Sequence, residues 1–138
     1  DDTLARSGDP LIVDCGAGTS YLGAVLYELV LGPAGKGTLL AIEARPELSV
    51  AAADRAKRFA QARFKVATGE IAATDLPSRP AIVTALHACD TATDDALALA
   101  IASTADHVAV VPCCQAEVAR QLDKAKPSDD ASAGAGCA

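Results

Sequence analysis

The stretch Leu11-Ile-Val-Asp-Cys-Gly-Ala-Gly-Thr-Ser-Tyr-Leu-Gly23 contains the pattern that decides the fold. It opens with three apolar residues and reaches Asp14. A run that is apolar on both faces is typical of a central strand in a parallel sheet. Gly16 and Gly18 follow, and without a Cβ they allow a sharp turn and let a ligand approach main-chain N–H groups. We therefore expect a buried strand that leads into a ligand-binding loop.

The alternation of strand and helix continues towards the C-terminus. Apolar residues at 22, 25, 26, 29 and 30 predict a helix over 21–31, which Gly32-Pro33 should end. Further strands are expected at 38–42, 64–67, 81–86 and 107–111, and further helices at 46–62, 91–105 and 115–124. This order predicts an α/β fold, a doubly wound and mostly parallel sheet with helices on both faces. Ligands of such sheets bind beyond the carboxyl ends of the strands, where the strand order reverses.

The length of 138 residues predicts one domain. We expect its core over 11–126, between a polar leader at 1–10 and a flexible tail at 127–138 that is rich in Ser, Asp, Ala and Gly. The sequence contains no methionine, so Asp1 is not a translation start and we expect a fragment or a processed protein.

Composition also indicates which classes of protein and which cellular compartment the sequence fits. No apolar run approaches the roughly 18 residues of a membrane span, so we expect no membrane protein. The five cysteines are odd in number and form no C-x-x-C pair, which argues against a disulfide framework and favours a cytoplasmic protein. The net charge of −6 argues against a broad basic surface for phosphate backbones.

The glycine loop suits a cationic, amino-acid-bearing ligand better than a dinucleotide. A dinucleotide fingerprint, G-x-G-x-x-G, needs a third glycine where this chain has Tyr21. Asp14 would also oppose a pyrophosphate, whereas a cationic, amino-acid-bearing ligand would be attracted to it. A nicotinamide- or flavin-dependent oxidoreductase is therefore the weaker alternative, and a tight turn that binds nothing is another.

Asp14, Gly16 and Gly18 resemble motif I of class I S-adenosylmethionine-dependent methyltransferases, with Ser20 where glycine is common. Glu43, at the end of the second expected strand, resembles the acidic residue with which that family binds the two ribose hydroxyls. The segment after the third strand resembles the adenine-side motif. The resemblance thus implies S-adenosyl-L-methionine as cofactor and the following cofactor-binding residues: Asp14, Gly16, Ala17, Gly18, Glu43, Ala44, Glu70 and Ile71. The fold of that family has seven strands, so the last two, an antiparallel pair, would be missing from this Rossmann-like sheet.

Two further segments, L-H-A-C-x-x-x-T-D at 86–94 and P-C-C at 112–114, resemble a particular methyltransferase branch. Some members of that branch are linked to RNA modification, including ribose methylation of tRNA. The two segments follow strands that should be neighbours, so their side chains would gather beside the reactive methyl group. The residues concerned are His87, Cys89, Asp90, Cys113 and Cys114.

Methyl transfer is an in-line displacement that needs a base only when the acceptor carries a proton. His87 is the candidate catalytic base because its unperturbed pKa lies near working pH, and Asp90 would orient it or bind the acceptor. A histidine that only hydrogen-bonds a neighbouring loop is an equal alternative. Cys113 and Cys114 are expected to be buried small apolar residues or to line the pocket rather than to act as nucleophiles. A zinc site is the lesser alternative because the spacing lacks C-x-x-C.

The sequence therefore predicts a methyltransferase with an unidentified acceptor, RNA or a small molecule. A non-catalytic module with the same fold remains an alternative. The basic residues between positions 55 and 65 are expected to form a solvated helix face, with nucleic-acid contact the second interpretation. Asp94 and Asp95 are expected at the positive end of a helix dipole.

Overall fold

A computed structural model describes residues 8–86, 88, 91–112 and 121–122. Its five strands form one parallel sheet in the order β3-β2-β1-β4-β5. Each strand begins and ends within two residues of the predicted bounds, and the strands are Leu11–Cys15 (β1), Thr38–Glu43 (β2), Phe64–Thr68 (β3), Pro80–Ala85 (β4) and His107–Val110 (β5). The predicted α/β fold, doubly wound with helices on both faces, is confirmed.

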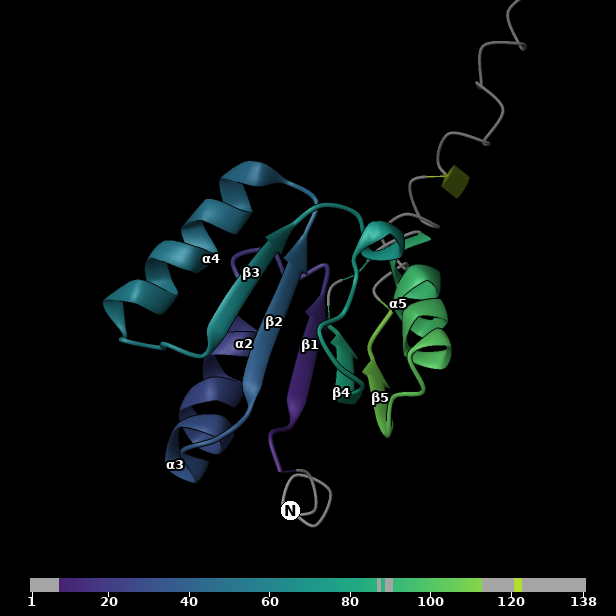
Figure 1. The fold of residues 1–138 in the computed structure, drawn as a ribbon. Coiled ribbons are helices and arrows are strands. Elements are labelled where there is room, and N and C mark those ends of the chain that lie inside the picture. The colour runs from purple at the N-terminus through teal and green to yellow at the C-terminus, as the bar shows by residue number, and fades with distance from the viewer. Residues whose placement is uncertain (1–7, 87, 89–90, 113–120, 123–138) are drawn as a thin grey trace, which may run out of the picture.

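Each face of the sheet has its own layer of helices (Figure 1). One face is covered by α2 (Tyr21–Leu26), which continues into the π-helix η1 (Tyr27–Leu31) and α3 (Gly32–Ala34), and by α4 (Pro46–Arg58). The other face is covered by α5 (Thr91–Ala102) and the short 3₁₀ helix η2 (Ile71–Ala73). Right-handed crossovers between parallel strands produce this distribution of helices.

β1 is the centre of the sheet, paired with β2 on one side and β4 on the other. Ile12 packs with Tyr27 and Leu39 on one face, while Leu11 and Val13 belong to the cluster on the opposite face. All five β1 residues are buried. A strand that is enclosed on both faces needs a continuous apolar run, which explains why the sequence pattern predicted this strand.

The helix after β1 differs from the prediction, because Gly32-Pro33 does not end it. The Gly32 N–H donates to the Tyr27 carbonyl, five residues back, and one further helical turn follows through Ala34. Proline lacks an N–H and clashes with the carbonyl of the preceding turn in a regular helix. The wider π-helical turn precedes Pro33, and Gly35, with φ of 65°, ends the helix instead.

Two other helices end earlier than predicted. α4 stops at Arg58 rather than near 62, and α5 stops at Ala102 rather than near 105. Ala60 and Thr104, just beyond these ends, have positive φ angles of 53° and 54°. A left-handed residue reverses the chain at the end of a helix, so alanine-rich sequence alone overestimates the helix length.

The chain order reverses between β1 and β4, so the loops after these strands diverge at the switch point where α/β sheets bind ligands. In Figure 1 the arrowheads of β1, β2 and β3 point to the top of the view, and the predicted ligand loop lies at that edge.

Some predictions lie outside the described residues. These are the tail at 127–138, all but residues 8–10 of the leader, and all but residues 121 and 122 of the helix at 115–124. Within the described residues, no helix is long and apolar enough to cross a membrane.

Candidate functional site

The glycine loop after β1 is a tight turn fixed against the next strand. Gly16 and Gly18 have φ angles of 60° and 58°, in the left-handed region that glycine adopts without a steric penalty. A Cβ on Gly16 would lie 3.3 Å from the Ala88 Cβ, so the loop also packs closely on the segment after β4. The Ala17 N–H donates to the Ile42 carbonyl at 3.0 Å and holds the loop beside β2.

Glu43 ends β2 and is the most heavily hydrogen-bonded carboxylate of the site. Its Oε2 accepts the Gly18 N–H at 2.6 Å, and its Oε1 accepts the Arg45 N–H at 3.0 Å and the Arg45 Nε–H at 2.7 Å. Burial alone would raise the pKa of Glu43, but the hydrogen bonds from Arg45 and Gly18 and the Arg45 charge outweigh it and lower the pKa. Glu43 is therefore a buried carboxylate that stays ionised.

Asp14 is buried at the end of β1 and is held by two hydroxyls. Ser20 Oγ lies 2.8 Å from Oδ2, and Thr84 Oγ1 on β4 lies 3.2 Å from Oδ1. Desolvation raises the pKa of Asp14, and the hydrogen bonds from Ser20, Thr84 and the Gly23 backbone lower it only in part. Ser20 itself has φ of 51°, a conformation that favours glycine, and its bond to Asp14 offsets part of that strain.

Two cavities are lined by these carboxylates, the first by Asp14 and the second by Glu43. The first, of about 300 Å³, we call the loop cavity; its lining residues are Asp14, Gly16, Ala17, Gly18, Thr19, Tyr21, Leu22, Arg45 and Leu86. The second, of about 420 Å³, we call the strand-end cavity; its lining residues are Gly16, Ile42, Glu43, Ala44, Arg45, Gly69, Glu70, Ile71, Ala88, Thr91, Ala92 and Asp95. Gly16 and Arg45 line both, so the two cavities adjoin. Every cofactor residue predicted from the sequence lines at least one of them.

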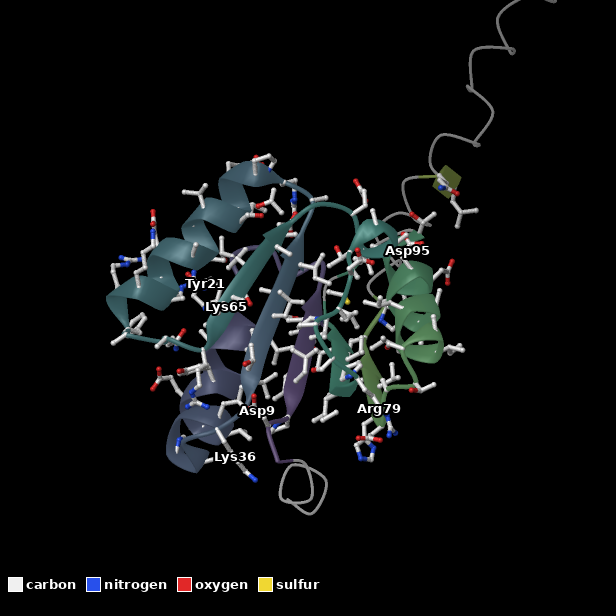
Figure 2. The ribbon with its side chains drawn as sticks, in the orientation of Figure 1. Asp9, Tyr21, Lys36, Lys65, Arg79 and Asp95 are labelled. Atoms are coloured by element: carbon white, nitrogen blue, oxygen red, sulfur yellow. The ribbon has the colours of Figure 1, made fainter. Side chains whose placement is uncertain are left out.

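The strand-end cavity combines apolar walls with acidic groups. Ile42 and Ile71 are buried side chains of its wall, and Glu70 and Asp95 supply carboxylates. Glu70 is exposed, while Asp95 is partly buried on α5. Figure 2 shows Asp95 at the upper end of α5, far from Lys36 and Arg79 at the lower end of the molecule. Asp95 therefore faces the cavity in addition to lying near a helix N-terminus, which was the only role its sequence position predicted.

The predicted catalytic residues, His87 and Asp90, lie outside the described residues, as do Cys89, Cys113 and Cys114. The residues on either side of His87 along the chain line the two cavities: Leu86 lines the loop cavity and Ala88 lines the strand-end cavity. In the described part of the chain, no three His, Cys, Asp or Glu side chains form a group that could hold a metal ion.

Other features lie away from the strand ends. A larger hollow of about 460 Å³ lies between α4 and the start of β3, at the opposite end of that strand from Gly69. In the basic segment, Lys57 pairs with Asp54 at 3.6 Å on the exposed face of α4. The predicted solvated face does not include Arg55, which donates to the Thr19 carbonyl, or Arg63, which donates to the Gly37 and Leu31 carbonyls at 2.9 Å. Cys15 is buried, and desolvation with the nearby Asp14 charge raises its pKa to about 12, which suits a packing role.

Sequence reasoning missed the partners of the two acids. Arg45 was not recognised because a single arginine before Pro46 is unremarkable, and Thr84 was not recognised because it is 70 residues from Asp14. Among these partners, Ser20 had a signal in the sequence, as a small polar residue at the start of the helix. Asp95, a lining residue of the strand-end cavity, also had one, since it lies one helical turn after Thr91 on the same face of α5.

Solved structures share this fold at low identity. A precorrin-6y C5,15-methyltransferase from Geobacter metallireducens GS-15 matches with a TM-score of 0.64 and 14% identity, covering 88% of this chain and 64% of that one. An rRNA methylase from Streptococcus thermophilus matches with a TM-score of 0.61 and 12% identity, covering 91% of this chain and 76% of that one. A SAM-dependent methyltransferase from Aquifex aeolicus matches with a TM-score of 0.50 and 19% identity, covering 56% of this chain and 40% of that one.

This chain thus spans less than two thirds of the Geobacter and Aquifex proteins. No curated protein matches it in sequence. A family model described as a methyltransferase domain does match, over residues 1–121. This range includes the glycine loop and the acidic residues at the strand ends. The chain belongs to this methyltransferase domain family.

Proposed function

We propose that the chain binds S-adenosylmethionine across the two cavities and forms the cofactor-binding core of a methyltransferase. The observation that carries the proposal is Glu43, a buried carboxylate at the end of β2 that lines the strand-end cavity and is bonded to the glycine loop by the Gly18 N–H. A carboxylate in this position accepts two hydroxyl hydrogens in charge-assisted bonds, as a ribose diol requires.

The strand-end cavity suits the nucleoside. Ile42 and Ile71 provide apolar walls for a flat purine, and the segment at Ala44 lines the same space next to Glu43. Asp95 and Glu70 offer acceptors for the exocyclic amine of adenine, and neither carboxylate has a hydrogen bond or ion pair within the described chain. The residues present therefore fit the nucleoside half of the cofactor.

The loop cavity suits the amino-acid half. Gly16, Ala17 and Gly18 bring main chain close to the cavity without large side chains in the way. Asp14 lines this cavity, and its negative charge favours the cationic sulfonium and ammonium groups. A bound cation would in turn offset the desolvation that raises the pKa of Asp14.

The cofactor supplies an electrophilic methyl group on a positively charged sulfur. The protein then needs to align the acceptor and, where the acceptor carries a proton, to remove it. We assign these roles to His87 as base and to Asp90 as the residue that orients it or binds the acceptor. The support is positional, since Leu86 and Ala88 line the two cavities. RNA and small molecules are the acceptor classes we propose, and a reducing cytoplasm is the expected setting.

Thermal unfolding with S-adenosylhomocysteine, S-adenosylmethionine and NAD tests the cofactor. The first two should stabilise the protein by about 2.7 kcal/mol at a hundredfold excess over Kd, and NAD should not. Stabilisation by NAD alone would contradict the proposal. His87→Ala should then reduce methyl transfer while cofactor affinity stays near wild type. Cofactor binding with no transfer to RNA or to small acceptors would instead favour the non-catalytic module.

A further inference from the structure

Arg45 covers the carboxylate to which the ribose would bind. Its Nε–H donates to Glu43 Oε1 at 2.7 Å, and Nη2 lies 3.4 Å from Oε2. The Glu43 side chain is only 4% exposed, whereas that of Arg45 is 62% exposed. The guanidinium therefore lies over the solvent side of a buried acid.

The hydrogen-bonding capacity of Glu43 is fully used in this arrangement. An ionised carboxylate has about four acceptor positions. Two of them receive the backbone N–H groups of Gly18 and Arg45, which are fixed by the loop and by the start of α4. The other two receive the Arg45 guanidinium. Two ribose hydroxyls need two acceptor positions, so they compete with the guanidinium and not with the backbone.

Arg45 also lies where the two cavities adjoin, since it lines both. A ligand that extends from Asp14 to Asp95 crosses the junction of the two cavities, which Arg45 lines together with Gly16. Because most of the Arg45 side chain is already in solvent, it can rotate away without breaking a packed core.

We infer that Arg45 is a latch, which pairs with Glu43 in the free protein and moves aside when the hydroxyls of a ribose replace it. The inference rests on the proposed function and adds to it the residue that controls access to the nucleoside site. Pairing keeps the buried Glu43 charge compensated while no ligand is bound. The same pairing reduces the apparent affinity to the intrinsic affinity multiplied by the fraction of molecules in which Arg45 has moved aside.

Isothermal titration with S-adenosylhomocysteine tests this inference by comparing wild type with Arg45→Ala. The Arg45 side chain is 62% exposed, so its pairing with Glu43 competes only weakly with a ligand, and the variant should bind about two- to five-fold more tightly. Raising the salt concentration screens the Arg45–Glu43 pair in wild type only, whereas it screens the attraction between Asp14 and the ammonium group in both proteins. The affinity of wild type should therefore fall less with salt than that of the variant. Arg58→Ala removes the same charge from the exposed end of α4 and is the control, with wild-type affinity and wild-type salt response expected.

A second readout uses the unaltered protein. The Arg45 Nε–H resonance of ¹⁵N-labelled wild type should be protected from exchange in the free protein and should lose that protection on addition of S-adenosylhomocysteine.

Weaker or unchanged binding by Arg45→Ala, or an Nε–H that stays protected in the complex, would overturn the latch while leaving the proposed cofactor in place. If S-adenosylhomocysteine binds neither wild type nor Arg45→Ala, the proposed function is wrong, and the inference about Arg45 is wrong for the same reason.

Discussion

The Gly18 N–H donates to Glu43 Oε2 at 2.6 Å and joins the two halves of the site across 25 residues of sequence. Gly18 belongs to the loop after β1, and Glu43 ends β2. The bond sets the loop next to the acid before any ligand arrives. Such preorganisation reduces the ordering cost of binding.

Glu43→Gln should weaken S-adenosylhomocysteine binding about 10- to 100-fold, because hydrogen bonds to a charged group contribute roughly 1.5–3 kcal/mol. The measurement is isothermal titration. Asp54→Asn, an exposed acid of α4 that pairs with Lys57, is the matched control and should retain wild-type affinity. Equal affinity of Glu43→Gln and wild type would show that the ribose does not bind Glu43.

Asp14→Asn should change how stability depends on pH. Because the folded pKa of Asp14 is raised above 3.8, the native state holds its proton longer than the unfolded state. The wild-type free energy of unfolding therefore loses a contribution as pH rises from 3.8 through the raised folded value, and the loss is complete above it. Urea unfolding between pH 4 and 7 should show the Asp14→Asn variant gaining stability relative to wild type with rising pH.

Ser20→Ala tests the same linkage from the donor side. The Ser20 hydroxyl lowers the pKa of Asp14, so its removal should raise that pKa further and extend the window to higher pH. The difference in unfolding free energy between Ser20→Ala and wild type should therefore grow as the pH rises. A pH-independent difference would mean that the hydroxyl does not act on the Asp14 carboxylate.

Gly23→Ala should destabilise the protein by about 1–3 kcal/mol through overpacking. Helix propensity alone predicts the opposite sign, a gain of about 1 kcal/mol. A Cβ at Gly23 would overlap Ser20 Oγ and lie 3.0 Å from Leu39 Cδ2 and 3.2 Å from Asp14 Oδ2. Denaturant unfolding measures the effect, and Ala24→Gly on the next residue calibrates the propensity term. A stabilised Gly23→Ala variant would contradict the packing described for this turn.

Asp95→Asn should reduce discrimination between S-adenosylhomocysteine and its inosine analogue. A carboxylate accepts a hydrogen bond from the 6-amino group of adenine and repels the 6-oxo group of hypoxanthine. An asparagine side chain bonds to either, so the ratio of the two Kd values should fall about 10-fold. Glu70→Gln, measured in parallel, shows which of the two acids reads the amine, and an unchanged ratio in both variants would exclude this role for either.

Local chemistry was enough to predict the strands and the glycine loop. The apolar run at 11–13 had to be a strand enclosed on both faces, and Gly16 and Gly18 had to turn. The helix ends were less predictable, because Ala60 and Thr104 end helices in conformations that their residue types disfavour. Such ends depend on what the chain must pack against next.

The sequence by itself determined an alternating α/β chain with acids and glycines at the strand ends, since these features depend on neighbouring residues. Only the tertiary structure decided that Thr84 reaches Asp14 from β4 and that Gly18 reaches Glu43. The fold likewise brought Asp95 of α5 to the cavity that Glu43 lines. These contacts join segments 25 to 70 residues apart, so they exist only once parallel pairing has brought the carboxyl ends of the strands to one edge.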